Sequence, residues 1–331
     1  RTAFSLPELA EIAAQNHHIF KELQYLSNID YKPIRYISFA HDEETYKALE
    51  ASKAWSKAAM IAPQQFREEI SPYFNANPKK YISALVSEDC WQATPGKVVD
   101  LVRNLGIAAG GTVMEDCRVL EACREGKYTS VLVQTHDKKY VEYRTEHFVN
   151  ALGSGAGKLC DSMGIDAGLY PVRHQAFITR RLPMLGKHGT NLDMLIDRQD
   201  YKGFSAVYGQ QIAYTGQIIG CASPKLDAMR IDKNLKVNTK AFLEIVSEMF
   251  SEWIPDLAGV GIQAVWAGYY TEPRYIVDPE LGLFVGMRGH GFMLSQYIAR
   301  MYVDKLLGRP VPEYFEKLKL NGPGLSEKAF K

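Results

Sequence analysis

The stretch Gly286-Met287-Arg288-Gly289-His290-Gly291-Phe292-Met293-Leu294 places three glycines around one histidine. The residues just before it, 283–286, have the composition of a β-strand, and an apolar periodicity typical of a helix runs from about Phe292 to Leu307. A glycine-rich turn between a strand and a helix points free backbone N–H groups and the positive end of the helix dipole at an acceptor or anion. The alternative is that the glycines serve only close packing at a crowded corner.

Around this stretch the sequence predicts a mixed α/β protein whose domains are interleaved along the chain. Ser5, Pro7 and Glu8 are typical of a helix start, with Ser5 as the capping residue. Helices are expected over 5–26, from Asp42 to about Met60, after Pro63, over 95–106 and from Asn238. Strands are expected over 34–39, 107–113, 118–122, 130–135, 140–150, 170–180 and 262–270, with hairpins over 203–220.

Composition and charge exclude several classes of protein. The 39 Lys and Arg residues against 38 Asp and Glu leave a formal charge of +1, so no net field favours nucleic acid or an anionic membrane. Hydrophobic residues make up 46% of the chain and charged residues 23%, which is typical of a soluble globular protein. No apolar run approaches the roughly 18 residues that a membrane span needs.

Cysteines and histidines give no metal or hydrolase motif. The eight histidines form no HExxH motif and no ligand cluster, and no GxSxG is present. We therefore expect no metal site. The cysteines are odd in number and form no CxxC pair, which argues against a disulfide framework and favours a reducing cytoplasm; they are Cys90, Cys117, Cys123, Cys160 and Cys221.

A second glycine run, Gly153-Ser154-Gly155-Ala156-Gly157-Lys158, follows the apolar stretch 147–150. It is not a P-loop, because Leu152 and Leu159 replace required residues, and Lys158 stands where a dinucleotide fingerprint has its third glycine. It either lets a cofactor approach the backbone or makes a tight strand-to-helix turn. The run Gly259–Ala264 matches GxGxxA, but it precedes a strand and is read as a turn.

Three blocks together resemble the flavoprotein family of D-amino acid oxidase, glycine oxidase and sarcosine oxidase. Residues 149–153 and 171–175 resemble its "VNAxG … PxRxQ" block, Trp266-Ala267-Gly268 resembles its "WAG" strand, and 286–294 resembles its "GxxGHGFxL" flavin loop. The blocks occur in the family's order along nearly the whole chain.

The resemblance implies a Rossmann-like FAD-binding domain, N-terminally incomplete, interleaved with an antiparallel-sheet substrate domain. The FAD-binding domain would comprise 1–30, 88–165 and 266–331, and the substrate domain 31–87 and 166–265. The family's opening strand and GxGxxG turn are not found in this sequence. We therefore expect that a companion polypeptide supplies this unit, that the chain is shortened, or that this form does not bind FAD.

The resemblance also implies the residues that would hold FAD. Gly268 occupies the place of the flavin-linking cysteine of monomeric sarcosine oxidases, so attachment there should be noncovalent. Arg1 belongs to a stretch, Arg1–Ser5, similar to the family's Arg-x-x-Phe-Ser. The expected cofactor-binding residues are Arg1, Val113, Ala151, Gly153, Gly289, His290, Gly291, Phe292 and Met293.

The resemblance identifies substrate-binding residues less directly than cofactor-binding ones. Met293 stands where sarcosine oxidases carry a carboxylate-anchoring lysine, and Tyr270 matches an active-site tyrosine of the family. Arg274 and Arg288 are the candidate replacements for the anchor, because guanidinium binds carboxylate bidentately; the alternative is that either is a surface arginine. Tyr208 and Tyr214 are further candidates to face the pocket.

The activity implied by the resemblance is oxidation of an amino acid or amine C–N bond by hydride transfer to flavin, with no dedicated base. The substrate would be a small amine or amino acid, and an oligomer is possible. Two alternatives stay open: an FAD-dependent 2-hydroxy acid dehydrogenase, and a flavin-free structural subunit of a larger dehydrogenase.

Overall fold

The structure is a computed structural model that describes residues 1–75, 80–182, 192–199, 203–212, 215–224, 239–325 and 327. Its largest element is an eight-stranded sheet with the order β13-β9-β12-β11-β10-β2-β4-β3. Strands β10 and β2 are parallel and the other neighbours are antiparallel. The strands are β2 (Tyr36–Ala40), β3 (Ala58–Ile61), β4 (Ser83–Ser87), β9 (Tyr170–Thr179), β10 (Met194–Asp197), β11 (Phe204–Ile212), β12 (Gln217–Pro224) and β13 (Ile262–Glu272).

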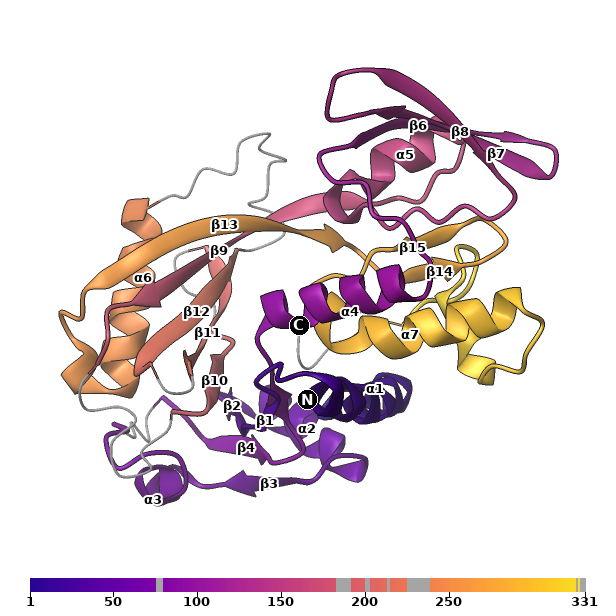
Figure 1. Cartoon of the computed structure of the whole chain (residues 1–331). Coiled ribbons are helices and arrows are strands. Elements are labelled where there is room, and N and C mark those ends of the chain that lie inside the picture. Colours follow the sequence, from indigo (N-terminus) through magenta and orange to yellow (C-terminus); the bar gives the residue numbers. More distant parts are fainter. Residues whose placement is uncertain are drawn as a thin grey trace.

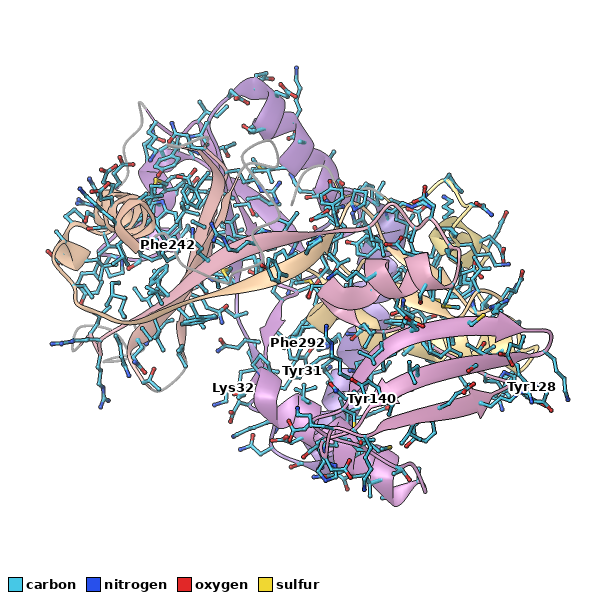
Figure 2. The ribbon with its side chains drawn as sticks, turned by 90° about the horizontal axis from the view of Figure 1, so that it is seen from above. Tyr31, Lys32, Tyr128, Tyr140, Phe242 and Phe292 are labelled. Carbon is cyan, nitrogen blue, oxygen red and sulfur yellow. The ribbon has the colours of Figure 1, made fainter. Side chains whose placement is uncertain are left out.

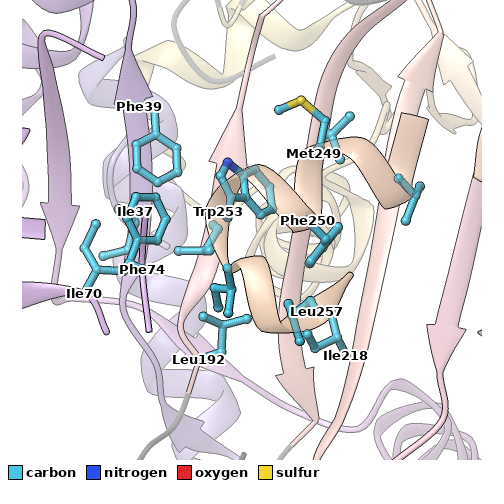
Figure 3. Packing of buried hydrophobic residues seen from close by; sticks show 14 of the residues in the cluster. Ile37, Phe39, Ile70, Phe74, Leu192, Ile218, Met249, Phe250, Trp253 and Leu257 are labelled. Carbon is cyan, nitrogen blue, oxygen red and sulfur yellow. The ribbon is translucent and has the colours of Figure 1, made fainter. Parts of the chain in front are cut away.

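One face of this sheet carries the main hydrophobic core. Helix α6 (Thr239–Trp253) lies across that face, and Figure 3 shows Phe250 and Trp253 of α6 beside Phe39, Ile37 and Ile218 of the strands. Because side chains alternate along a strand, the register places a second set together on the opposite face. We call this set the polar face: Tyr36, Met194, Tyr208, Gln210, Cys221, His174, Gly268 and Tyr270.

Strand β13 is bulged near its start. Ile262 lies opposite Thr179 and Ala264 lies opposite Ile178, so Gln263 is an extra residue in β13. From Ala264 onward the two strands stay paired without interruption to Glu272 opposite Tyr170. The bulge therefore precedes the part of β13 that contributes Gly268 and Tyr270 to the polar face.

A helical layer faces the polar face of the sheet. Helices α1 (Pro7–Leu26) and α7 (Gly291–Leu306) pack together (Figure 1) around a core that includes Leu9, Ile12 and Ile298. The Asn16 side chain donates to the Met293 carbonyl and accepts from the Tyr297 N–H, both at 2.7 Å, and so joins the two helices. This layer also holds α4 (Pro95–Ala108), η6 (Glu313–Leu318) and the strand pairs β1 (Lys32–Pro33) with β5 (Trp91–Gln92) and β14 (Ile276–Asp278) with β15 (Leu283–Val285).

A three-stranded antiparallel sheet stands apart from the large one, at the upper right of Figure 1. It is followed by η3 (Gly153–Gly155) and α5 (Ala156–Ser162), and Asn150 makes one parallel bridge with Leu283 of β15. The three strands are β6 (Arg118–Glu125), β7 (Tyr128–Gln134) and β8 (Tyr140–Thr145). The short elements that complete the fold are α2 (Glu43–Ala51), η1 (Ser52–Ala54), η2 (Pro63–Gln65), α3 (Phe66–Glu69) and η5 (Pro255–Leu257).

The expected mixed α/β class is confirmed, and several element bounds are corrected. The helix expected over 42–60 ends at Ala51, and Ala58–Ile61 pairs with β4 instead. The strand expected over 107–113 is wrong: α4 continues to Ala108 and no strand follows before Arg118 in this described segment. Strand β8 ends at Thr145 rather than at 150.

Ser5 does not cap α1, since Leu6 is the N-cap residue and makes no side-chain cap. The Ser5 N–H instead donates to the Glu327 carboxylate at 2.9 Å. Asn238, expected to start a helix, lies outside the described residues. The interleaved domain boundaries stay a prediction.

Candidate functional site

A cavity of about 240 Å³ lies between the polar face, β5, α1 and the start of α7. Tyr31 and Phe292 both line this cavity, although they lie far apart in the sequence. Figure 2 shows them near each other in the middle of the molecule. The lining residues are Arg1, Thr2, Ala13, Asn16, His17, Phe20, Tyr31, Tyr36, Trp91, Gln92, Ala93, Pro95, Met194, Gln210, Phe292 and Met293.

His290 occupies the N-cap position of α7 but makes no side-chain cap. Its ring is used elsewhere: Nε2 lies 3.0 Å from Arg1 Nη2 and Nδ1 lies 2.5 Å from the Tyr275 hydroxyl. Because a guanidinium only donates, Nε2 must accept, so Nδ1 carries the proton and donates to Tyr275. Burial, together with the charges of Arg1, Arg288 and Arg198, holds the pKa of His290 well below its usual range, so the ring stays neutral.

Two glycines of the turn are required by their surroundings. Gly286 has a φ of +70°, and a Cβ there would collide with the Arg274 carbonyl oxygen. A Cβ on Gly289 would lie 2.6 Å from the Tyr270 ring. The turn therefore packs directly against the end of β13, and the first N–H groups of α7, which have no carbonyl partner within the helix, are presented beside the cavity.

Arg288 and Glu272 form a buried ion pair. Arg288 Nε donates to Glu272 Oε2 at 2.8 Å, and the two side chains are 2% and 8% exposed. Arg288 Nη2 is buried without a hydrogen-bond partner among the described residues. Burial raises the pKa of Glu272 and Arg288 opposes that rise. This guanidinium retains a donor for a further acceptor such as a carboxylate.

On the polar face, three side chains from three strands meet. The hydroxyls of Tyr208 and Tyr270 lie 3.3 Å apart, and the His174 ring packs against Tyr270 in a tilted arrangement with centroids 3.9 Å apart. Burial lowers the pKa of His174 to about 4, so this imidazole is neutral at physiological pH. Its Nδ1 is buried and has no hydrogen-bond partner in the described part of the chain.

The structure brings some of the expected cofactor residues together and leaves others apart. Arg1, Phe292 and Met293 line the cavity, and Gly289, His290 and Gly291 form the turn beside it. Ala151 and Gly153 follow Asn150, whose parallel bridge to Leu283 places them alongside the strand that leads into that turn. Val113 is 46% exposed in the segment after α4 and does not line the cavity.

Of the expected substrate residues, some lie at the turn before α7 or on the polar face, and others do not. Tyr270 contacts Gly289 and Tyr208, and Arg288 lies in the turn. Arg274 instead donates to the Leu320 and Gly322 carbonyls and so holds the C-terminal segment. Tyr208 lies on the polar face, while Tyr214 lies outside the described residues.

Several cavity residues were not found from the sequence: His17, Tyr31, Tyr36, Trp91 and Gln210. Each belongs to an element whose other residues read as ordinary core or surface, so no local motif marks them. The alternation of Tyr36 with buried Ile37 and Phe39 does indicate that Tyr36 faces away from the core, which could have suggested it.

Among the described residues, no helix has the length and apolarity needed to cross a membrane. In the same part of the chain, no group of three or more His, Cys, Asp or Glu side chains could hold a metal ion.

Comparison with known proteins gives a family match and structural neighbours. The family model described as "FAD dependent oxidoreductase" matches residues 2–305. L-proline dehydrogenase from P. horikoshii is 22% identical with a TM-score of 0.77, and glycine oxidase from Geobacillus kaustophilus is 16% identical with a TM-score of 0.76; each alignment covers 97% of this chain and 84% of the other. Iminodiacetate oxidase from Chelativorans sp. is 13% identical with a TM-score of 0.72, covering 95% and 84%. No curated protein matches.

Proposed function

Since this chain belongs to the FAD-dependent oxidoreductase family, we propose that it oxidises the C–N bond of an amino acid or another amine that carries a carboxylate. The observation that carries this proposal is the meeting of three features at one cavity: the start of α7, the polar face of the sheet, and the Arg1 side chain; the buried pair of Arg288 with Glu272 lies in the turn before α7 and at the end of β13. The expectation of a flavoprotein oxidoreductase from the sequence is confirmed by the family match.

The residues present fit FAD, the cofactor of the family. The His290 side chain does not cap α7, so the N–H groups of Gly291 and Phe292 are available to an acceptor. A Cβ on Gly153 would meet nothing within 4 Å, which leaves its backbone open to close approach. We infer that these residues, with Ala151 and Met293, hold FAD, and that Arg1, which the resemblance assigns to the cofactor, faces the substrate instead. Gly268 offers no side chain for a covalent link.

A bound FAD would supply the hydride acceptor for oxidation of the substrate C–N bond to an imine, which water would then hydrolyse. The chain's own residues bind and orient the substrate. We infer that Arg1, which lines the cavity, and Arg288, whose Nη2 has no hydrogen-bond partner among the described residues, bind the substrate carboxylate. The neutral His290 fixes Arg1, and the Tyr208 and Tyr270 hydroxyls supply hydrogen bonds. We assign no catalytic base.

A companion unit is the second part of the proposal. Helix α4 presents apolar side chains to solvent, with Val99 61%, Val102 37% and Leu105 40% exposed, and Val149 and Leu152 are 44% and 42% exposed. Exposed apolar groups at helical spacing are typical of a surface that another element covers. We infer that a nucleotide-binding unit packs there. An oligomer would also cover such a surface.

A reducing cytoplasm stays part of the proposal as well. It is supported by the five cysteines, none of which forms a disulfide.

The test is anaerobic mixing of the purified flavin-loaded protein with panels of D- and L-amino acids, secondary amines and 2-hydroxy acids. Bleaching of the visible flavin bands by amines, with release of the matching keto acid or aldehyde, is the expected result. Bleaching by hydroxy acids alone would replace the proposal with a hydroxy acid dehydrogenase. A protein that stays colourless after FAD is added, with or without a companion chain, would leave only a structural role.

A further inference from the structure

Five aromatic side chains from three separate segments form one continuous side of the cavity. We call them the aromatic wall: His17, Phe20, Tyr31, Trp91 and Phe292. The rings of His17 and Trp91 stack with centroids 3.5 Å apart, and His17 Nδ1 lies 2.7 Å from the Tyr31 hydroxyl. Phe20 contacts Tyr31 and Phe292, with centroids 5.4 Å apart in each pair.

The wall has an apolar, uncharged character. Burial and the nearby charge of Lys21 lower the pKa of His17 to about 4, so this ring is neutral at physiological pH. Among the described residues that line the cavity, Arg1 carries the one ionised side chain and no carboxylate is present. A cationic substituent could stack on such rings, but the positive charges of Arg1 and Lys21 act against it.

We propose that the substrate is an aromatic amino acid, bound with its carboxylate toward Arg1 and its side-chain ring against the aromatic wall. This inference rests on the proposed function and names its substrate class. A planar apolar ring gains from stacking and from displacing water off the parts of these rings that face the cavity, whereas a methyl or hydrogen substituent would leave those parts hydrated. Gln92 and Gln210 line the same cavity, with Gln210 Nε2 donating to Gln92 Oε1 at 3.1 Å, and their remaining amide groups can bind the polar part of the substrate.

The experiment uses the flavin-loaded protein and two redox-inert carboxylates, 3-phenylpropanoate and propanoate, which differ by one phenyl ring. Calorimetry or perturbation of the flavin spectrum gives both dissociation constants without turnover. We expect 3-phenylpropanoate to bind at least about tenfold more tightly than propanoate. Trp91→Ala should lose most of that ratio, and Trp91→Phe should keep most of it because a stacking ring remains.

The matched control is Tyr25→Ala. Tyr25 lies on α1, the helix that carries His17 and Phe20, but it is 92% exposed and does not line the cavity. It should keep the wild-type ratio. If Trp91→Ala fails to fold, Phe292→Ala tests the same wall from α7.

The outcomes separate this inference from the proposed function. Equal affinity for the two carboxylates, combined with flavin bleaching by small amines, would overturn the aromatic assignment and leave the proposed function standing. Preference for 3-phenylpropanoate without bleaching by any amine would support the aromatic assignment of the cavity and overturn the proposed function. Preference for 3-phenylpropanoate that survives both Trp91→Ala and Phe292→Ala would overturn the assignment of the wall.

Discussion

The ion pair of Arg288 with Glu272 predicts how the stability of the protein responds to one substitution. Arg288→Met removes the cation and leaves the Glu272 carboxylate in a site where it is 8% exposed. Breaking a buried pair by removing one partner costs about 3–5 kcal/mol, because the remaining charge loses both water and its counterion. Methionine retains the unbranched, apolar part of the side chain without the guanidinium and, like arginine, must accept the φ of 53° at this position. The loss should therefore report the charge.

The assay is urea unfolding of the flavin-loaded protein at pH 7 and pH 5. Burial already raises the pKa of Glu272 above its ordinary value of 4.5, and removal of Arg288 raises it further. A carboxyl with a raised folded pKa binds more protons when folded than when unfolded, so stability falls as pH rises through that window. The deficit of Arg288→Met should consequently shrink at pH 5. The double variant Arg288→Met with Glu272→Met should recover at least half of the loss at pH 7.

A loss below about 0.5 kcal/mol at pH 7, or an equal loss at both pH values, would refute this reasoning. The first result would mean that water reaches the pair, and the second that the cation acts through packing alone.

Three further predictions concern other contacts. Gly286→Ala should lower stability by more than about 2 kcal/mol, measured by thermal unfolding, since φ is +70° and the Cβ would meet the Arg274 carbonyl; an unchanged melting temperature would contradict it. Burial alone lowers the pKa of His41, but the hydrogen bond to Asp197 (2.6 Å) and its charge raise it overall. The stability from this pair is full below pH 6.5 and is lost as pH rises through the folded pKa, so His41→Asn should flatten the slope of unfolding free energy between pH 6 and 9. Asn16→Ala should cost about 1–2 kcal/mol in urea unfolding by removing the link between α1 and α7, and a neutral result would show that link to be dispensable.

The elements with strong local patterns could be predicted from the sequence. Helices α1 and α7 follow their apolar periodicity, and Gly308 ends α7 with a φ of +69° as a C′ glycine does. The sequence predicts a helix up to about Met60, yet Ala58–Ile61 pairs with β4, a partner that local propensity does not contain. Residues 107–113 have strand composition, but no described strand pairs with them.

In the candidate site, too, features that are contiguous in sequence could be predicted, whereas contacts between distant residues could not. The turn at 286–291 is contiguous in sequence, so its glycines and its position before a helix were visible. The contact of Arg1 with His290 joins residues 289 positions apart, and the stack of His17 on Trp91 joins α1 to β5. Such contacts depend on how the layers pack, and a single sequence carries no direct record of that packing. Arg274 illustrates the same limit, because its two acceptors are carbonyls of the C-terminal segment.

The bulge at Gln263 absorbs one residue of β13 without changing how the rest of the strand pairs. Ile262 lies opposite Thr179 and Ala264 lies opposite Ile178, so a strand lacking Gln263 would keep Gly268 opposite His174 and Tyr270 opposite Val172. A residue deleted between Ala264 and Gly268 would instead bring Gly268 opposite Gln175 and turn it to the other face of the sheet. Position 263 therefore tolerates a change of length that the following positions of the strand do not, and the side chains that face the cavity are insulated from it.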